Sequence, residues 1–378
     1  MVGETRIDWP ELIAFKRTFT DPMPGKIATR FAKQGIEAFH GMACFTGPDA
    51  VTVEGRTLKG GAILIATGAR PVPLGFSGAE HAIESDAFME LEHLPERIVM
   101  IGGGYIAAEF AHIAARAGAK VIVLQRAERM LIRFDADLVG WLMETFSAVG
   151  IDVRTQNTVT AIERLGDEFR VHVQTPEGGA TVSADLVVHA AGRAPDIAEL
   201  DVSAGRIEVE DGRLRLNEFL QSVANPIVYA AGDAAATGPP LTPVSSHDGK
   251  IVAANIIAGN HQCPNYRGVP SVAFTLPPIA AVGLSEAEAR KLAAKLRVKS
   301  AKVPDWYTAR RVGESVYGFK TLVDEDSDRI LGAHLVGPHA DEVINLFGLA
   351  IRNGLIVDDL KTTMFAYPTG ASDIGAML

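Results

Sequence analysis

The six residues Gly102-Gly103-Gly104-Tyr105-Ile106-Ala107 constrain the fold of this chain more than any other segment. They match Gly-x-Gly-x-x-Gly/Ala and stand between an apolar run, Ile98–Ile101, and a helical pattern over Tyr105–Ala117. Gly102 permits a tight turn, Gly104 has no Cβ to block a pyrophosphate, and the small Ala107 lets helix and strand pack closely. The start of the helix also offers free backbone N–H groups to an anion. Because a second strand pattern follows at Lys120–Leu124, the segment predicts a dinucleotide-binding turn.

The residue at the end of that second strand indicates which dinucleotide is preferred. Sites that prefer NAD place Asp or Glu there to bind the ribose 2′-hydroxyl. Here Gln125 takes the place, 23 positions after Gly102, and Arg126 and Arg129 follow it. A guanidinium without a competing carboxylate suits a 2′-phosphate, because it can hold the phosphate through paired donors. The sequence therefore favours NADPH over NADH, with solvated surface arginines as the alternative interpretation.

Strand and helix patterns alternate through this part of the chain. A helix is expected over Asp135–Val149 and a third strand over Ile151–Arg154, which gives a β-α-β-α-β series and hence a parallel sheet of the α/β class. An N-cap at Asp8 begins a helix that breaks at Asp21–Gly25, and a second helix runs to about Gln34. The other expected elements are strands at Ile36–Phe39, Ala50–Val53, Ala62–Ile65, Val159–Ile162, Phe169–Val173, Thr181–Ser183, Leu186–His189, Ile227–Ala230, Val272–Phe274, Tyr317–Val323 and Ile330–Val336, and helices at Pro243–Ala258, Ser285–Ala294 and Asp341–Asn353.

Length and charge exclude several classes of protein. At roughly 150 residues per domain, 378 residues predict two to three domains. The net charge of −10 disfavours a nucleic-acid partner, because an acidic protein releases no counterions on binding a polyanion. No run of about 18 uncharged apolar residues is present, and Met1–Phe15 lacks the apolar core of a signal peptide. We therefore expect a cytoplasmic protein with no membrane partner.

The cysteines and histidines give no sign of a metal site or a redox pair. Cys44 and Cys263 lie 219 positions apart, which excludes a disulfide framework, a zinc site and a Cys-x-x-Cys pair. His-Glu-x-x-His is absent, and His334 and His339 fit structural positions better than metal ligands. No metal is predicted.

Three further segments each follow an apolar strand, and the order in which they occur along the chain is informative. They are Ile65-Ala66-Thr67-Gly68-Ala69-Arg70-Pro71, Ala190-Ala191-Gly192-Arg193-Ala194-Pro195 and Tyr229-Ala230-Ala231-Gly232-Asp233. Together with the turn at Gly102, they resemble the family of pyridine nucleotide–disulfide flavoenzymes that includes glutathione reductase, dihydrolipoyl dehydrogenase and mercuric reductase. The segments Pro270–Thr275, Ile279–Leu284 and Ile330–His334 resemble the dimerisation domain of the same family. The resemblance covers essentially the whole chain.

The resemblance implies a fold and a division into domains. The fold is α/β with two dinucleotide-binding domains, one for FAD and one for NAD(P)H, and an α+β dimerisation domain at the C-terminus. The implied boundaries are a partial FAD-binding domain over 1–72, an NAD(P)H-binding domain over 73–194, a return segment of the FAD-binding domain over 195–264, and a dimerisation domain over 265–378. A homodimer formed through 265–378 is expected.

The resemblance also implies roles for particular residues, with FAD and NADPH as cofactors and NADH as the alternative. Gly102, Gly104 and Ala107 match the nicotinamide-nucleotide turn, Tyr105 matches the ring that covers the flavin, and Glu109 matches a carboxylate beside the nicotinamide. Thr67 and Gly68 match a turn near the FAD pyrophosphate, and Asp233 matches a carboxylate near the flavin's ribityl chain. The remaining cofactor-binding positions are Gln125, Arg126, Gly192 and Thr242.

The chain departs from the family pattern at both ends. Family members begin with a strand, a glycine turn and a helix that hold the ADP half of FAD, followed by a Cys-x-x-x-x-Cys pair. Neither feature is present here, so we expect at least one βαβ-sized unit, about 30 residues, to be missing. Near the C-terminus Tyr367 replaces a histidine base of the partner subunit, and a tyrosine, with an ordinary pKa of about 10, is a poor proton acceptor near neutrality.

These observations lead to one main hypothesis and two alternatives. The main hypothesis is an FAD-dependent NAD(P)H oxidoreductase that passes hydride from nicotinamide to flavin and on to an unidentified acceptor, with Glu109 and Tyr367 as the catalytic candidates. One alternative is a dimer that binds NADPH without flavin. The other is an active flavoenzyme whose true start lies upstream, in which case Met1 is an internal methionine.

Overall fold

The computed structural model describes residues 6–378, and these form two compact units. The first unit contains the described residues up to Ile13, then Pro73–Ala191 and Arg267–Leu378. The second contains Ala14–Val72 and Gly192–Tyr266. Within the described residues, no helix is both long and apolar enough to cross a membrane.

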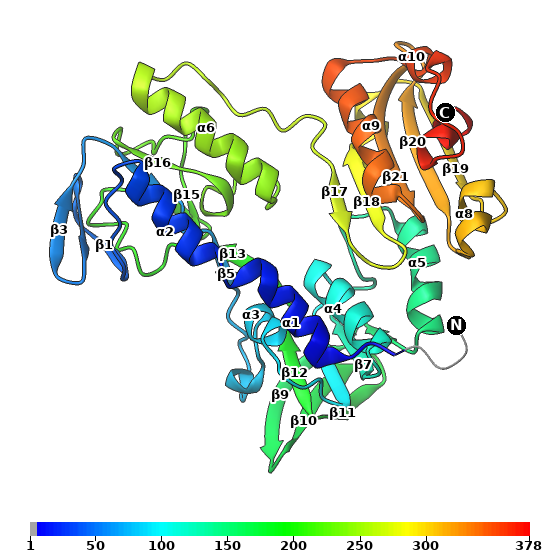
Figure 1. Ribbon diagram of the computed structural model, residues 1–378, viewed down its shortest axis with the longest axis horizontal. Coiled ribbons are helices and arrows are strands. Elements are labelled where there is room, and N and C mark those ends of the chain that lie inside the picture. The colour runs from blue at the N-terminus through cyan, green and yellow to red at the C-terminus, as the bar shows by residue number, and fades with distance from the viewer. Residues whose placement is uncertain (1–5) are drawn as a thin grey trace. The chain divides into compact units, whose positions relative to one another are not determined.

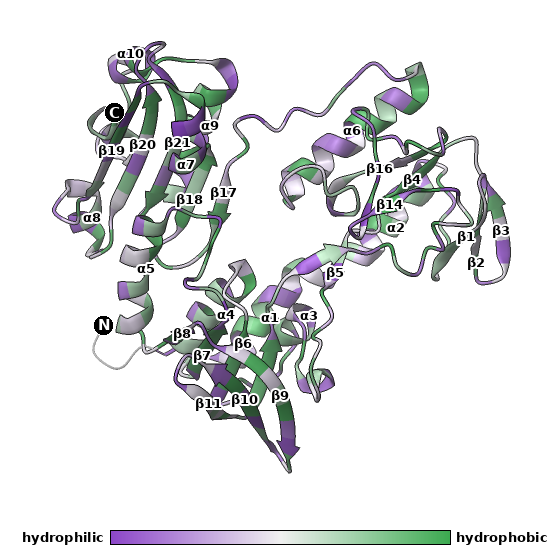
Figure 2. Cartoon of the chain, turned by 180° about the vertical axis from the view of Figure 1, so that it is seen from behind, coloured by the Kyte–Doolittle hydropathy of each residue, from purple (hydrophilic) through white to green (hydrophobic). Residues whose placement is uncertain are grey.

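The centre of the first unit is a four-stranded parallel sheet in the order β12-β6-β7-β8, with α4 and α5 as its crossover helices (Figure 1). This arrangement confirms the parallel sheet that the alternating pattern predicts. The strands β6 and β7 are nearly continuous apolar runs, as expected for strands covered on both faces, and β6 is coloured hydrophobic in Figure 2. The bounds are β6 (Arg97–Ile101), α4 (Tyr105–Arg116), β7 (Lys120–Gln125), α5 (Ala136–Ala148), β8 (Asp152–Thr155) and β12 (Leu186–His189).

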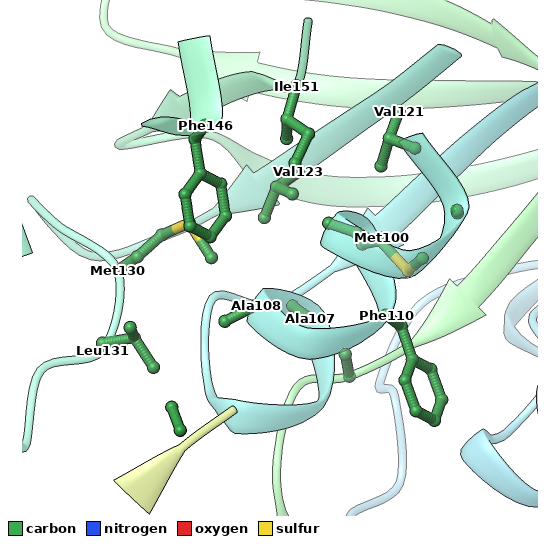
Figure 3. Close-up of a cluster of buried hydrophobic side chains, with 14 of the residues drawn as sticks. Met100, Ala107, Ala108, Phe110, Val121, Val123, Met130, Leu131, Phe146 and Ile151 are labelled. Carbon is green, nitrogen blue, oxygen red and sulfur yellow. The ribbon is translucent and has the colours of Figure 1, made fainter. Parts of the chain in front are cut away.

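A buried cluster fixes α4 and α5 on this sheet (Figure 3). Ala107, Ala108 and Ala111 on α4 are completely buried, so the helix lies close to the strands. Met100 and Val123 of the sheet and Phe146 of α5 fill the space beside them. The other elements of this part are η1 (Ala79–His81), α3 (Ser85–Met89) and an antiparallel sheet of β9 (Thr158–Leu165), β10 (Glu168–Thr175) and β11 (Gly178–Ala184). The helix α1 (Trp9–Thr20) begins in this unit and ends in the second.

The C-terminal part of the first unit is a five-stranded antiparallel sheet in the order β17-β18-β21-β20-β19, with α9 packed on it (Figure 1). The acidic stretch after β20 is a hairpin turn, because β20 ends at Asp324, β21 begins at Arg329, and the two residues are paired. The bounds are β17 (Ser271–Ala273), β18 (Ile279–Gly283), α7 (Glu286–Leu292), β19 (Leu296–Lys302), α8 (Tyr307–Val312), β20 (Gly318–Asp324), β21 (Arg329–Val336), α9 (Ala340–Asn353), α10 (Val357–Thr362), η3 (Gly370–Asp373) and α11 (Ile374–Met377).

The second unit consists of short strands and two helices. Its bounds are α2 (Met23–Lys33), β1 (Ala43–Gly47), β2 (Ala50–Val53), β3 (Arg56–Lys59), β4 (Ile63–Ile65), β5 (Ala69–Pro71), β13 (Arg193–Pro195), β14 (Val209–Glu210), β15 (Arg213–Leu214), β16 (Val228–Ala230), η2 (Gly232–Ala234) and α6 (Thr242–Ala258). The strand predicted at Ile36–Phe39 is wrong: these residues form no strand, and the first strand of the chain is β1. Residues 34–42 contain two glycines and are largely exposed, so no pleated partner surface supports a strand there.

The helix α2 carries apolar side chains that the described chain leaves in contact with solvent. Met23, Ile27 and Phe31 lie at helical spacing and are each 36–42% exposed, and no residue of α2 is buried. Four-residue spacing places them on one face of the helix. The three side chains therefore form a partly exposed apolar face on α2.

Candidate functional site

The glycine turn between β6 and α4 has the geometry that its sequence predicts. Gly102 has φ = +107°, and a Cβ there would lie 2.3 Å from the carbonyl oxygen of Ala190, so no side chain fits. Gly104 is the N-cap of α4, with ordinary extended dihedrals, and a Cβ there would meet nothing within 4 Å. Within residues 6–378, no side chain caps this helix start. The turn therefore presents uncapped N–H groups to open space, which fits a pyrophosphate.

The loop from Arg126 to Phe134, which follows β7, is fastened to this turn. The Leu131 N–H donates to the carbonyl oxygen of Gly103 at 2.7 Å. Gln125 is buried, and its Nε2 donates to the carbonyl oxygen of Arg129 at 3.1 Å. Gln125, the last residue of β7, stands in the sequence where a ribose-binding carboxylate would be expected. In the structure its side-chain amide is hydrogen-bonded to the loop that follows β7.

The two arginines of this loop differ in their surroundings. Arg129 donates to the carbonyl oxygens of Leu131 at 3.1 Å and Ile132 at 2.9 Å, so its guanidinium holds the loop together. Arg126 is exposed, and the structure of residues 6–378 gives it no hydrogen bond or ion pair. Of the two, Arg126 has the guanidinium that is free to meet a ligand.

Tyr105 and Glu109 lie one turn apart on α4 and face the start of the C-terminal part. The Oε1 atom of Glu109 accepts a hydrogen bond of 2.9 Å from the N–H of Phe274. Burial raises the pKa of Glu109, and this hydrogen bond offsets part of the rise. The ring of Tyr105 packs edge-on against Phe134 at 5.4 Å, and burial likewise raises the pKa of its hydroxyl.

Tyr367, the second catalytic candidate, is 76% exposed. Its ring lies 6.1 Å from that of Tyr307, and the Arg311 guanidinium donates to the carbonyl oxygen of the neighbouring Pro368 at 3.1 Å. In the described part of the chain no contact joins Tyr367 to Glu109, so the two candidates do not form one cluster within a single chain. The same residues contain no group of three or more acidic, histidine or cysteine side chains arranged to hold a metal ion.

In the second unit, the turn at Thr67 and Gly68 is bonded to the strand end near Asp196. Thr67 Oγ1 donates to the Asp196 carbonyl oxygen at 2.6 Å, and the Asp196 N–H donates to the Gly68 carbonyl oxygen at 3.0 Å. Gly68 has φ = +74° and Gly192 has φ = +120°, and both are open on the Cβ side or nearly so. These turns are rigid and leave room above their glycines, which fits a close approach by a phosphate or ribose.

Asp233 lies in η2, directly after β16, and is half-buried with no hydrogen bond or ion pair in the described structure. Thr242, the first residue of α6, is exposed, and the start of α6 is also uncapped by side chains of the described residues. A free carboxylate and an uncapped helix start are groups that can meet a ribityl chain and a developing negative charge. The residues present therefore fit the flavin roles assigned to them.

The sequence reasoning missed the residues that hold the Asp233 turn. Asp248 on α6 is completely buried, and its two oxygens accept from the Gly232 N–H at 3.1 Å and the Tyr266 hydroxyl at 2.9 Å. Burial first, and the Asp248 carboxylate in addition, raise the pKa of Tyr266 to about 12. No local pattern singles out Asp248 in the sequence, because Ser246, His247 and Lys250 beside it are polar as well.

Comparison with known proteins places these features in a family. A family model described as "Pyridine nucleotide-disulphide oxidoreductase" matches residues 8–249, and the model of that family's dimerisation domain matches residues 269–377. The glutathione reductase of Burkholderia cepacia is 33% identical over 370 residues, which cover 98% of this chain and 81% of that protein. A 180-residue match at 49% identity spans the whole of a Staphylococcus aureus protein described as an uncharacterized 19.7 kDa protein in a mercuric resistance operon.

Other relatives are longer than this chain. A mercuric reductase of Bacillus cereus is 32% identical over 345 residues, and the chain spans 54% of its length. Among solved structures, the HOCl-induced flavoprotein disulfide reductase RclA from Escherichia coli superposes with a TM-score of 0.89 at 26% identity. That match covers 98% of this chain and 86% of the other.

Proposed function

The chain belongs to the pyridine nucleotide-disulphide oxidoreductase family, and from this membership we propose that it is an FAD-dependent NAD(P)H oxidoreductase. It would take hydride from a nicotinamide nucleotide and pass electrons to an acceptor that is not yet identified. The observation that carries the proposal is the open, uncapped glycine turn at Gly104, with Glu109 one helical turn beyond Tyr105. We propose a homodimer through 265–378, which the matched dimerisation model supports.

On the nicotinamide side, the residues of this chain bind and orient the nucleotide. The N–H groups at the start of α4 would hold the pyrophosphate. The free guanidinium of Arg126, with no carboxylate at Gln125 to repel a phosphate, supports NADPH as the preferred donor and NADH as the weaker one. Tyr105 and Glu109 would lie against the nicotinamide end, with Glu109 held in place by the Phe274 N–H.

On the flavin side, the turn at Thr67 and Gly68, Gly192, Asp233 and the start of α6 at Thr242 would hold the cofactor. When bound, FAD supplies the hydride acceptor and electron store of the reaction. Asp233 would accept a hydrogen bond from a hydroxyl of the ribityl chain, and the N-terminus of α6 would stabilise negative charge. Cys44 and Cys263 are both free thiols, so the proposal routes no electrons through a disulfide of this chain.

A second candidate function is NADPH binding without flavin, by a dimer with no redox activity of its own. The exposed apolar face of α2, formed by Met23, Ile27 and Phe31, favours it, because that face belongs to the unit that would have to hold FAD. The nucleotide turn at Gly102–Gly104 lies in the other unit.

Titration of the purified chain with FAD and NADPH tests both candidates. The main proposal expects a visible flavin spectrum after incubation with FAD, and bleaching of that spectrum on anaerobic addition of NADPH. Saturable NADPH binding in a calorimeter with no uptake of FAD would replace it with the second candidate. A chain that binds neither compound would overturn both.

A further inference from the structure

A cluster of charged side chains around a buried lysine joins α5 to the antiparallel sheet of the C-terminal part. At its centre is Lys320 on β20, whose side chain is 7% exposed. Its Nζ donates to Asp135 Oδ2 at 2.8 Å and to Asp137 Oδ2 at 2.7 Å, and it lies 3.3 Å from Glu286 Oε2. Burial alone would lower the pKa of Lys320, but the hydrogen bonds to Asp135 and Asp137 raise it above its ordinary value, so the ammonium is charged.

Asp135 connects this ammonium to the start of α5. While Oδ2 accepts from Lys320, Oδ1 accepts from the backbone N–H groups of Asp137 at 3.0 Å and Leu138 at 3.5 Å. Asp135 is thus the N-cap of α5, and its side chain is 9% exposed. The point at which the loop 126–134 becomes a helix is therefore fixed by a side chain of the C-terminal sheet.

Two further contacts show that this is a docked helix and not a single ion pair. A Cβ on Gly318 of β20 would lie 2.4 Å from the ring of Trp141, so the bare backbone of Gly318 admits that ring. Lys302 of β19 donates to Glu144 at 2.6 Å. Asp137, Trp141 and Glu144 are spaced by four and three residues, which places them on one face of α5. Figure 1 shows α5 beside this sheet.

The same loop is also fastened to the nucleotide turn four residues before Asp135, through the bond from the Leu131 N–H to the Gly103 carbonyl oxygen. The loop that carries Arg126 is therefore held at Ala127 by the Gln156 N–H, at Leu131 by Gly103 near the pyrophosphate position, and at its end by Lys320 through Asp135. Removing the ammonium would leave the buried Asp135 carboxylate without its nearest cation, and such a carboxylate turns toward water. The helix start and the loop before it would move with it.

We propose that Lys320 is a positioning residue for dinucleotide selection: from the C-terminal sheet it fixes Asp135 and thereby the loop that presents Arg126 to a 2′-phosphate. This inference rests on the proposed binding of NADPH at the turn of Gly104. It adds to that proposal a determinant of NADPH preference that lies 194 positions beyond Arg126 in the chain.

The test compares three variants of the full chain by calorimetric titration with NADPH and, separately, with NADH. Lys320→Met removes the buried ammonium but keeps an unbranched chain of similar length. Asp135→Asn keeps an N-cap for α5, because asparagine caps as well as aspartate, but removes the charge that Lys320 holds. Lys302→Met is the matched control, because it breaks the other ion pair between α5 and this sheet, at a side chain that is 29% exposed.

We expect Lys320→Met and Asp135→Asn each to raise the Kd for NADPH by roughly five-fold or more, with a smaller change for NADH, so that the preference for NADPH falls. Lys302→Met should leave the Kd for NADPH and the Kd for NADH within about two-fold of those of the unaltered chain. If Lys320→Met does not fold, Asp135→Asn carries the test alone.

A lower melting temperature with an unchanged NADPH-to-NADH ratio would overturn the inference and leave Lys320 a structural residue. Equal losses in all three variants would also overturn it, since the docking of α5 as a whole would then be responsible. If the unaltered chain binds NADPH and the variants bind it equally well, only this inference fails. If the unaltered chain binds no NADPH, the proposed function fails with it.

Discussion

The carboxylate of Glu109 on α4 accepts a hydrogen bond from the backbone N–H of Phe274, just after β17, at 2.9 Å. This bond ties the helix of the nucleotide turn to the beginning of the C-terminal part, 165 residues further along the chain. The carboxylate is held in a half-buried place, where its charge is disfavoured by burial and favoured by the N–H group. The pKa of Glu109 therefore depends on both its burial and this hydrogen bond.

We expect Glu109→Gln to stabilise the protein at neutral pH and not in acid. Burial raises the folded-state pKa of Glu109 above that of the unfolded chain, so the folded protein loses stability as the pH rises through the interval between the two values. Glutamine keeps an acceptor for the Phe274 N–H and carries no charge. Thermal unfolding at pH 4 and pH 8 measures this, and a melting-temperature gain that is equal at both pH values, or absent at pH 8, would contradict it.

Gly104→Asp should abolish NADPH binding while leaving the fold intact. Gly104 has dihedral angles that any residue adopts and open space at its Cβ, and aspartate is a favoured N-cap, better than glycine by a few tenths of a kcal/mol. Its charge would, however, occupy the pyrophosphate position. The contrasting variant is Gly102→Ala, whose Cβ would collide with the Ala190 carbonyl at φ = +107° and should cost about 1–3 kcal/mol. Calorimetry and thermal unfolding of both variants separate binding from folding.

Arg126 and Arg129 should prove to have different roles although they stand three residues apart. Arg126→Ala removes a free guanidinium, so NADPH affinity should fall by roughly 10-fold or more at unchanged melting temperature, with NADH affinity unaffected. Arg129→Ala removes the bonds to the Leu131 and Ile132 carbonyls and should lower stability by about 1–2 kcal/mol. An Arg126→Ala protein with unchanged preference for NADPH would refute the assignment.

The network around Asp248 predicts that the Asp233 turn depends on a buried hydrogen-bond acceptor. Asp248→Leu leaves the Gly232 N–H and the Tyr266 hydroxyl without their acceptor, at a cost of about 2–4 kcal/mol. Tyr266→Phe removes only the hydrogen bond from the Tyr266 hydroxyl to Asp248, so it should lower the free energy of unfolding by less. FAD affinity, measured by fluorescence, should fall in both variants while NADPH affinity stays the same. Equal loss of both affinities would show instead that the chain unfolds as a whole.

The sequence predicts the nucleotide-binding part well because local pattern and tertiary environment agree there. The apolar runs of β6 and β7 are the interior strands of a parallel sheet, and the glycine turn fixes the helix that follows. The stretch Ile36–Phe39 reads equally well as a strand, but it has no partner strand and stays irregular. The strand Leu296–Lys302 was missed, because its alternate lysines and arginine mask a pattern that pairs with β20.

The residues of the candidate site could be predicted from the sequence only where they lie together in one short segment. Gly102 and Gly104 act through backbone geometry that is local in sequence, so the motif finds them. Asp248, Lys320 and Arg129 act through partners that the fold supplies, 16, 185 and two residues away, and no spacing rule identifies them. Lys320 in particular is an ordinary strand lysine in the sequence, and only its burial against Asp135 distinguishes it.

A last prediction concerns His112, which is buried on α4 with no hydrogen-bond partner for either ring nitrogen among the described residues, its ring edge-on to Phe146 at 4.4 Å. Burial, and to a lesser degree the charge of Arg116, lowers its pKa to about 4. Between about pH 6.5 and 4, the unfolded chain therefore binds a proton at this histidine that the folded chain does not bind. The free energy of unfolding should consequently fall by about 2 kcal/mol as the pH falls from 7 to 5. His112→Leu should remove most of that loss, whereas His93→Leu, at an exposed histidine, should leave it in place. Urea unfolding at both pH values measures the difference, and a pH dependence that survives in His112→Leu would show that other groups cause it.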